Sequence, residues 1–460
     1  MKRLLVSLIL SMMVASMAAA DQSPAPFQNG DVVCFIGDSI THSRKYHGYI
    51  SLYYLTRFPE RQIRFVNCGI SGDSAGGGVA RLDWDILPNR PKVVALMFGM
   101  NDVNRGLYGR ANPDAKNLES REAALRNYEQ NMTRLAADLQ EQLHPRFILI
   151  TPSPYDDTAQ IEIENLYGVN DALGRCGEIG RKLAAQIGAG VVDFHGPMTA
   201  LNQQEQKLNP HYTLIGPDRV HPLDVGQMVM AYLFLTAQQV PATVSTLALD
   251  GDAATVTTAE NCTVTEARSL GGKLSFDCLE KSLPFPIDPA AQEALRLVPV
   301  EAKLDQQLLR VRFAADGKYR LSIDGTSVGE WTRDELAAGV NLALNTKTPQ
   351  YQQAAKVMSV NEQRRTLEIR LRSLAQIQIM LRRAKVDEGN DEAINAYFTD
   401  YLEKSKVNGV PNAYFKSQFD NYLKTRPVVP QIKSQIEDFV QQLWKINQPV
   451  THHWEIEKIG

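Results

Sequence analysis

The sequence predicts an α/β domain with a parallel sheet, followed by a small β-rich module and a C-terminal helical region. In the first part of the chain, five short apolar runs alternate with amphipathic stretches, as strands and helices do in a parallel sheet. Short strand-like runs and an Asp-Gly turn signal fill the second part. Apolar residues at helical spacing mark the third part. We expect these parts at 25–240, 241–333 and 334–460.

Each expected strand of the α/β domain is an unbroken apolar run bounded by turn residues, the pattern of a strand buried on both faces. The clearest helices between these strands are expected at 121–143 and 170–187. Right-handed crossovers bring the carboxyl ends of successive strands to one edge of the sheet, where ligands bind in such folds. The residues that follow each strand therefore decide what the domain does. The strands are expected at 32–36, 63–68, 93–98, 147–151 and 191–194.

The amino terminus has the pattern of a secretory signal peptide over residues 1–20. Lys2 and Arg3 form its basic start, an apolar stretch follows, and small residues end it at Ala18-Ala19-Ala20. No later stretch is long and apolar enough to span a membrane. We therefore expect a secreted or periplasmic protein that has no membrane span after cleavage.

Composition and charge narrow the classes of partner. The chain has 460 residues, of which 44% are hydrophobic and 22% charged, as in soluble globular proteins. Its formal net charge of -3 gives no positive footprint for nucleic acid. The sequence indicates no oligomeric state.

The five cysteines indicate neither a zinc site nor a redox dithiol, because none forms a Cys-x-x-Cys pair. No His-Glu-x-x-His pattern occurs either, so we expect no metal and no cofactor. Cys34 and Cys68 lie in apolar runs and are expected as buried thiols. Cys262 and Cys278 flank a Gly-Gly turn, and the sequence leaves open whether they form a disulfide in an oxidising compartment.

A serine follows the first expected strand directly, in the stretch Gly37-Asp38-Ser39. Gly37 permits a sharp turn at the strand end, and Ser39 lies where the strand gives way to a helix. The N-terminal amides of a helix favour negative charge, which suits a nucleophile whose reaction builds an oxyanion. The alternative is that Ser39 only caps the helix.

Three further groups follow the first in chain order. Gly72 lies in a loop after the second strand, where its N–H can face an anion. Asn101 follows the third strand and carries two N–H donors. Asp218 precedes His221 by three residues, so its carboxylate can bond one ring nitrogen and leave the other free as a base. The structural alternatives are a turn, a helix cap and a surface loop, but together with the serine these groups supply a nucleophile, a base, an orienting acid and oxyanion donors.

Four blocks of the first domain carry these residues: Gly37-Asp38-Ser39-Ile40, Ile70-Ser71-Gly72-Asp73, Gly99-Met100-Asn101-Asp102 and Asp218-Arg219-Val220-His221-Pro222. They resemble the blocks of the SGNH or GDSL hydrolase family, over about half the chain. By this resemblance, Ser39, His221 and Asp218 match the catalytic triad, and Ser39, Gly72 and Asn101 match the oxyanion hole. The resemblance implies a flavodoxin-like α/β/α sandwich and metal-free ester hydrolysis. One position departs from the family pattern: the residue before Asn101 is a methionine, where a small residue is commoner.

The leading hypothesis is a secreted serine esterase. Ser39 would attack an ester carbonyl after His221 takes its proton, while Asp218 orients His221. One alternative is a lipase or lysophospholipase of the same family. Another is a catalytically idle fold that binds glycans, whose natural signature would be a lost serine, histidine or asparagine, and none of these is lost.

The loops expected around Ser39 predict the kind of ester. The segments 71–81, 104–120 and 151–158 are polar or glycine-rich and offer no long apolar wall. We therefore expect hydrolysis of short-chain, acetyl-type esters of a small molecule or polysaccharide, with a carbohydrate as the alcohol partner.

Three other features carry weaker expectations. The β-rich module suits either a carbohydrate-binding or substrate-gating part or a structural insert. Arginines between residues 364 and 383, Arg372 among them, are expected on a solvated helix face. His42 and His47 follow the nucleophile and are candidates for lining its pocket.

Overall fold

The computed structural model describes residues 21–43, 45–109, 112–407 and 412–459. The expected signal peptide therefore lies outside the described residues. Within the described ranges, no helix combines the length and the apolar character needed to cross a membrane.

The α/β domain is built on a five-stranded sheet in the order β2-β1-β3-β4-β5. All four pairings are parallel. This is the doubly wound order of flavodoxin-like folds, which confirms the fold class expected from the sequence. All five expected strands are present, shifted by no more than a few residues. They are β1 (Val32–Gly37), β2 (Arg64–Gly69), β3 (Val93–Met97), β4 (Arg146–Ile150) and β5 (Gly190–Val192).

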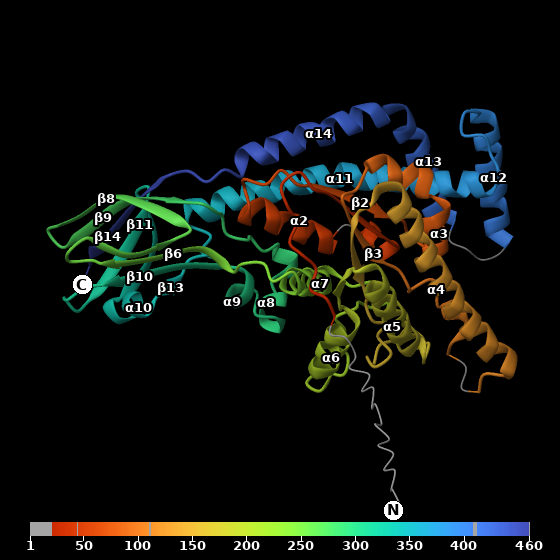
Figure 1. Cartoon of the computed structure of the whole chain (residues 1–460), viewed down its shortest axis with the longest axis horizontal. Helices are drawn as coiled ribbons and strands as arrows, with labels where there is room; N and C mark the ends of the chain where they lie inside the picture. The colour runs from red at the N-terminus through yellow and green to blue at the C-terminus, as the bar shows by residue number, and fades with distance from the viewer. Residues whose placement is uncertain (1–20, 44, 110–111, 408–411, 460) are drawn as a thin grey trace, which may run out of the picture.

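Helices cover both faces of this sheet (Figure 1). Helices α2 and α7 pack against each other on one face, and α3, α4 and α5 pack in sequence on the other. Helix α4 begins earlier than expected because the Asp114 side chain accepts the Asn117 N–H and caps it. The bounds are α2 (Lys45–Arg57), α3 (Ala75–Ala80), α4 (Ala115–Leu143), α5 (Val169–Ile187) and α7 (Asp224–Ala237).

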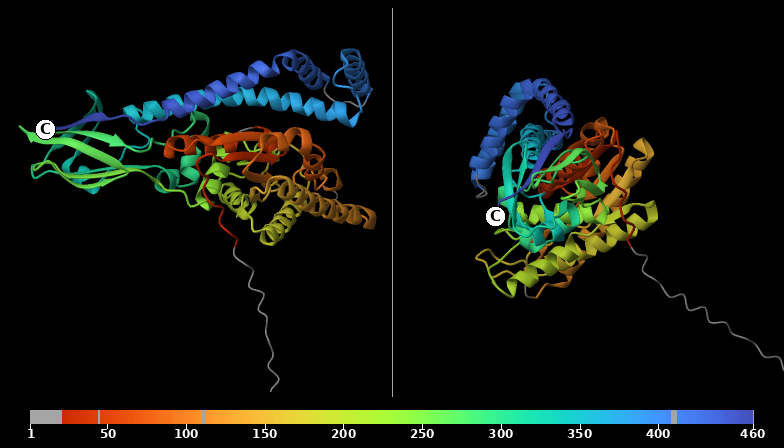
Figure 2. Two further views of the ribbon diagram at one scale, coloured as in Figure 1. Left: turned by 45° about the horizontal axis from the view of Figure 1, so that its top comes forward. Right: turned by 90° about the vertical axis from the view of Figure 1, so that its left-hand side faces the viewer.

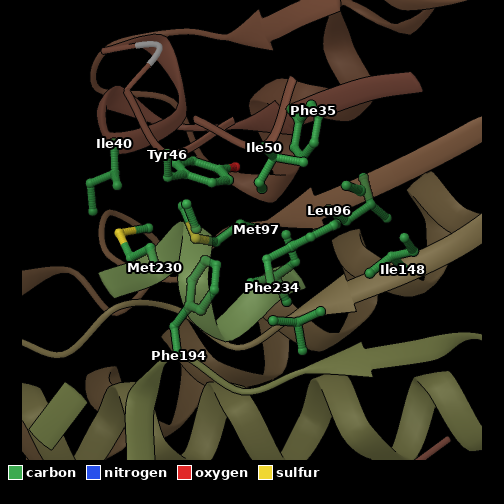
Figure 3. Close-up of a cluster of buried hydrophobic side chains, with 14 of the residues drawn as sticks. Phe35, Ile40, Tyr46, Ile50, Leu96, Met97, Ile148, Phe194, Met230 and Phe234 are labelled. Atoms are coloured by element: carbon green, nitrogen blue, oxygen red, sulfur yellow. The ribbon is translucent and has the colours of Figure 1, made fainter. Parts of the chain in front are cut away.

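The core between the sheet and the α2–α7 face fixes the strand that precedes the candidate nucleophile. In Figure 3 the Phe35 ring of β1 lies near Ile50 of α2, and Phe234 of α7 lies against Leu96 of β3. Each of these four side chains is completely buried. Close packing of this kind leaves little room for movement, so the loops at the strand ends start from a rigid base.

The β-rich module contains two sheets, ordered β13-β10-β6-β7 and β12-β11-β14-β9-β8. The expected hairpin at Asp324-Gly325 joins β11 to β12. The module contains β6 (Thr243–Asp250), β7 (Thr255–Glu260), β8 (Cys262–Leu270), β9 (Lys273–Glu280), β10 (Gln306–Arg312), β11 (Lys318–Ile323), β12 (Thr326–Thr332), β13 (Val340–Asn341) and β14 (His452–Lys458).

Strand β14 corrects the expectation that the chain is helical throughout 334–460. It lies between β9 and β11 in the second sheet, antiparallel to both. Trp454 and Ile456 are buried while His453 is exposed, which is the two-residue period of a half-buried strand. This alternation is visible in the sequence but spans too few residues to outweigh the long helical pattern before it.

All five cysteines are buried free thiols, so the Cys262–Cys278 disulfide that the sequence left open is not formed. The two residues lie on neighbouring strands β8 and β9, but Cys278 pairs directly with Val264. Cys262 is therefore a diagonal neighbour of Cys278, and the two side chains contact each other as free thiols.

The C-terminal helices run along the length of the elongated molecule, from the β-rich module past the α/β domain (Figures 1 and 2). Helix α11 packs against α2, the edge strand β2 and α14. The expectation of a solvated arginine face on α11 is wrong for Arg364, Arg365 and Arg372, which are buried. These helices are α11 (Pro349–Arg383), α12 (Asp391–Val407), α13 (Asn412–Thr425) and α14 (Val429–Ile446).

A buried ion pair joins the α/β domain to the β-rich module. Arg57, at the end of α2, donates to Asp305 at 3.0 Å and to the Leu304 carbonyl at 2.8 Å. Asp305 also accepts the Phe285 N–H at 2.9 Å. Burial raises the pKa of Asp305 to about 6, despite the neighbouring Arg57. Breaking such a pair by removing one partner leaves a buried charge, so it holds the two parts together.

Gly69 provides a stability prediction, because α1 (Ser39–His42) passes against it. A Cβ at residue 69 would lie 2.6 Å from the carbonyl carbon of Thr41 and closer still to the backbone nitrogen of His42. These are backbone atoms that cannot rotate away. We expect Gly69→Ala to lower the free energy of unfolding by about 1–3 kcal/mol, measured by urea denaturation.

Gly180, inside α5, is the matched control. No atom lies within 4 Å of a Cβ built there. Gly180→Ala is expected to raise the free energy of unfolding by about 0.5–1 kcal/mol, because alanine favours a helix interior over glycine. Equal stabilities for the two variants would contradict the close approach at Gly69.

Candidate active site

The candidate site lies at the carboxyl ends of β1, β2 and β3, where the parallel pairing brings three loops together. Ser39 is the first residue of the short helix α1, directly after β1. Asp38 caps this helix, and its carboxylate accepts the Ile40 N–H at 3.0 Å. The turn from strand to helix therefore holds Ser39 at the sheet edge.

The structure brings Ser39, His221 and Asp218 into one hydrogen-bonded chain, although 182 positions separate the serine from the histidine. The Ser39 hydroxyl lies 2.7 Å from Nε2 of His221. Nδ1 of His221 lies 2.5 Å from Oδ2 of Asp218. Oδ1 of Asp218 accepts the backbone N–H of His221 at 2.9 Å. This is the expected order of nucleophile, base and orienting carboxylate.

Asp218 is held in its charged form. Burial alone would raise its pKa, but hydrogen bonds from the side chain and backbone of His221 hold the pKa below its usual value. The side chains of His221 and Asp218 are 44% and 45% exposed. The site is therefore open to solvent and to bulky ligands on this side.

Gly72 and Ser39 present backbone N–H groups without a hydrogen-bond partner among the described residues. Gly72 has a φ of +76°, in the left-handed region that glycine adopts easily, and no atom lies within 4 Å of a Cβ built there. Space for a ligand is therefore present beside this glycine. We call residues 69–73 the β2 loop.

Asn101 is bound to the β2 loop. Its side-chain N–H donates to the Asp73 carbonyl at 2.7 Å, and its Oδ1 accepts from Arg105 at 3.3 Å. One of its two amide hydrogens is left over for a ligand. The two contacts also fix which way the amide faces, so its free donor has a set direction.

Asp102, which the sequence reasoning did not single out, links the loops after β2 and β3. Its two carboxylate oxygens accept the Ala75 N–H at 2.9 Å and the Gly99 N–H at 3.0 Å. Its position next to Asn101 in the third block was the available signal. Burial raises the pKa of Asp102 to about 6.

His42 and His47, which were candidates for lining the pocket, both make structural contacts. Nδ1 of His42 accepts the Ser71 N–H at 3.0 Å, so this buried ring holds the β2 loop. Burial lowers the pKa of His42 to about 3, which keeps Nδ1 free as an acceptor. His47 is buried against the Phe35 ring and bonds the Thr41 carbonyl at 3.0 Å. Both histidines therefore support the structure beneath the site.

Arg219 is a further residue that the sequence reasoning missed, although it lies inside the fourth block. It has a φ of +63°, uncommon for a residue with a side chain. Its guanidinium donates to the carbonyls of Asp156 at 2.8 Å, Ala159 at 3.1 Å and Ile163 at 3.1 Å. The loop after β4 is thereby fixed to the segment that carries Asp218 and His221.

Among the described residues, no group of three or more His, Cys, Asp or Glu side chains is arranged to hold a metal ion. A cavity of about 740 Å³ lies elsewhere, between α11, α14 and the β2 edge. None of the five expected site residues lines it.

Comparison with known proteins places these residues in a family. Residues 33–234, which include all five expected site residues, match the model of the GDSL-like lipase/acylhydrolase family. An acetylxylan esterase from Geobacillus stearothermophilus is 27% identical over 222 residues, which are 45% of this chain and 93% of that relative. A crystal structure of such an esterase from that organism is 26% identical, with a TM-score of 0.38, and the match covers 46% of this chain and 96% of the other.

A second kind of solved structure matches nearly the whole chain. A gut microbial diltiazem-metabolizing enzyme is 33% identical to this chain with a TM-score of 0.87. The match covers 95% of this chain and 100% of the other, so the two share the β-rich module and the helical region as well as the α/β domain.

The buried Asp38 provides a prediction on pH. Burial raises its pKa to about 7, and the nearby Asp102 and Asp73 carboxylates add to the shift. Because this pKa lies above the value of about 3.9 in an unfolded chain, the folded state keeps the proton longer. The contribution of Asp38 to stability is therefore fully present below about pH 4 and is lost as the pH rises toward 7.

Asp38→Asn keeps the acceptor for Ile40 and removes the titration. We expect the difference in free energy of unfolding, variant minus wild type, to increase between pH 4.5 and pH 7.5 in urea denaturation. Asp83→Asn, on an exposed side chain, is the control and should follow the wild type at both pH values. A constant difference for Asp38→Asn would show that its carboxyl does not titrate in this range.

Proposed function

Because this chain belongs to the GDSL-like lipase/acylhydrolase family and is a carboxylic ester hydrolase, we propose that it is a secreted serine esterase that removes acetyl-type groups from carbohydrate esters. The observation that carries the proposal is the hydrogen-bonded chain from Ser39 through His221 to Asp218. Export is supported by the signal-peptide pattern at 1–20.

In the proposed reaction, Nε2 of His221 takes the Ser39 proton while Oγ attacks the ester carbonyl carbon. The positive charge that forms on His221 is stabilised by Asp218, whose lowered pKa keeps it ionised. The protonated His221 then gives its proton to the leaving alcohol, and an acyl-enzyme on Ser39 remains. His221 next activates a water molecule that releases the acid and restores Ser39.

The negative oxygen of each tetrahedral intermediate would be held by the backbone N–H groups of Ser39 and Gly72 and by the Asn101 side chain. Within the described part of the chain, the two backbone donors have no competing partner, and one hydrogen of the Asn101 amide binds the Asp73 carbonyl. Donors that are fixed before the reaction stabilise developing charge without the cost of reorganisation.

Three observations support a small acyl group and a polar alcohol. The side chains of His221 and Asp218 are nearly half exposed, so a bulky carbohydrate can reach the serine. The cavity of about 740 Å³ is not lined by the triad, so it offers no acyl tunnel to a lipase. The relative from Geobacillus stearothermophilus is an acetylxylan esterase. The solved structure that matches 95% of this chain is a diltiazem-metabolizing enzyme, so diltiazem belongs in the assays as well.

The proposed triad predicts strongly non-additive losses. Ser39→Ala and His221→Ala should each lower kcat by several orders of magnitude, and the double variant should lose little more, because the two side chains act as one unit. An organophosphonate should label the wild type on Ser39, as detected by peptide mass spectrometry. Labelling at the wild-type rate in Ser39→Ala would rule out this nucleophile.

The proposed acyl preference is tested with p-nitrophenyl esters of two to twelve carbons. We expect kcat/KM to be highest for acetyl or propionyl and to fall by octanoyl, because a lipase would instead gain about 0.8 kcal/mol for each methylene it buries. Acetate release from acetylated xylan and consumption of diltiazem should be measured beside it, with Ser39→Ala as the blank. A maximum at eight carbons or more would favour the lipase alternative.

A further inference from the structure

The long helix α11 lies outside the part of the chain that matches the family model, yet it touches the β2 loop. Ile70 of the loop is buried in a small apolar cluster with Ala375 and Ile379 of α11. The region shared with the acetylxylan esterase covers only 45% of this chain. The contact between α11 and the β2 loop therefore joins the C-terminal helical region to the α/β domain.

Arg372 is the polar centre of this contact. Its Nε donates to the Gly69 carbonyl at 3.1 Å, where β2 ends and the loop begins. Its two terminal nitrogens bind the two oxygens of Asp85 at 2.6 and 2.8 Å. This two-pronged geometry sets the position and the angle of both partners, which a single contact would not do.

Asp85 connects Arg372 to the far end of the β2 loop, through the ion pairs that Arg81 forms with Asp85 and Asp73. Its Oδ2 also accepts from Nη1 of Arg81 at 2.5 Å, and Nε of Arg81 donates to Asp73 at 2.8 Å. Although burial alone would raise the pKa of Asp85, Arg372 and Arg81 hold this pKa at about 2, so the Asp85 carboxylate is ionised. The side chains of all four residues are less than a tenth exposed.

A glycine of helix α3, which follows the β2 loop, makes room for this chain of ion pairs. A Cβ at Gly77 would overlap the carboxylate of Asp73, so glycine at this position lets the carboxylate turn inward. The carbonyl of Asp73 is the group that binds the Asn101 amide at 2.7 Å. Arg372 therefore reaches both ends of the loop that carries Gly72, and through Asp73 it reaches Asn101.

We propose that Arg372 is a positioning residue for the oxyanion hole, through which the C-terminal helix α11 holds the β2 loop in its reactive geometry. The inference rests on the proposed function of Gly72 and Asn101. A donor displaced by about 1 Å can cost on the order of 100-fold in rate, because hydrogen bonds to a developing charge depend steeply on geometry. Arg372 touches no reacting atom and acts only through the loop.

Arg364 provides a matched control on the same helix, eight residues earlier. It is also buried, forms an ion pair with Glu368 at 2.6 Å and donates to the Phe65 carbonyl at 3.3 Å. Phe65 lies near the start of β2, away from the β2 loop. Both arginines line the cavity of about 740 Å³, so methionine fits at either place.

The test compares Arg372→Met with Arg364→Met in steady-state hydrolysis of p-nitrophenyl acetate and in thermal unfolding. We expect Arg372→Met to lower kcat by about 10- to 100-fold with KM little changed. Arg364→Met should leave kcat near the wild-type value, while its melting temperature falls as much as that of Arg372→Met. Arg372→Lys keeps the positive charge but cannot bind both oxygens of Asp85 at once, so it should give an intermediate kcat. This variant also keeps the proposal testable if Arg372→Met does not fold.

The Asn101→Ala background separates positioning from general destabilisation. If Arg372 acts through the oxyanion hole, the loss of kcat on Arg372→Met should be smaller in Asn101→Ala than in the wild type. An undiminished loss there, or equal losses for the two arginine variants, overturns the positioning role while leaving the esterase intact. A wild type without esterase activity, or Ser39→Ala with full activity, overturns the proposed function and this inference with it.

Discussion

The parallel pairing of β1 with both β2 and β3 is the constraint on which the candidate site depends. Gly37 stands opposite Gly69 in β2 and opposite Met97 in β3, so the three strands end at one level. The serine, glycine and asparagine of the site follow these ends within a few residues. A slip of one residue in either pairing would move one group by about 3.3 Å, more than a hydrogen bond tolerates.

Three carboxylates lie buried close together around the ends of these strands, and burying ionisable groups costs free energy of folding. Burial raises the pKa of both Asp38 and Asp102, and the neighbouring Asp73 carboxylate raises both further. The cost is offset because these groups accept backbone N–H groups or an arginine that would otherwise lack a partner. The carboxylates thus hold the loops of the site, while Ser39 and His221 stay accessible.

The sequence predicted the parts of the site that depend on local pattern. Ser39, Gly72 and Asn101 each follow an apolar run. Asp218 precedes His221 by only three residues, so their side chains can meet within one local turn. The parallel sheet follows from the same alternation of apolar runs and amphipathic helices. In each case the signal lies within about ten residues, which is the range that periodicity and motif reasoning cover.

What the sequence could not show depends on which distant surfaces meet. Arg372 and Asp85 are 287 positions apart, and no pattern within α11 tells that its arginines face a carboxylate rather than water. The arginine stripe was therefore placed on a solvated face. Strand β14 was missed for a related reason, because its partners β9 and β11 come from a module more than a hundred residues earlier.

The placement of β14 also has a consequence for how the chain is assembled. The excursion through α11 to α14 leaves the β-rich module after β13 and returns to it at β14, in the middle of a sheet. The helices form a closed loop with both ends tethered in one module, and the loop-closure entropy is lost only when β14 docks. Strands β9 and β11 cannot be bridged before that, so this sheet is expected to close late in folding. A chain cut short before residue 452 would lack β14, so the helical segment from α11 to α14 would be joined to the β-rich module only through β13.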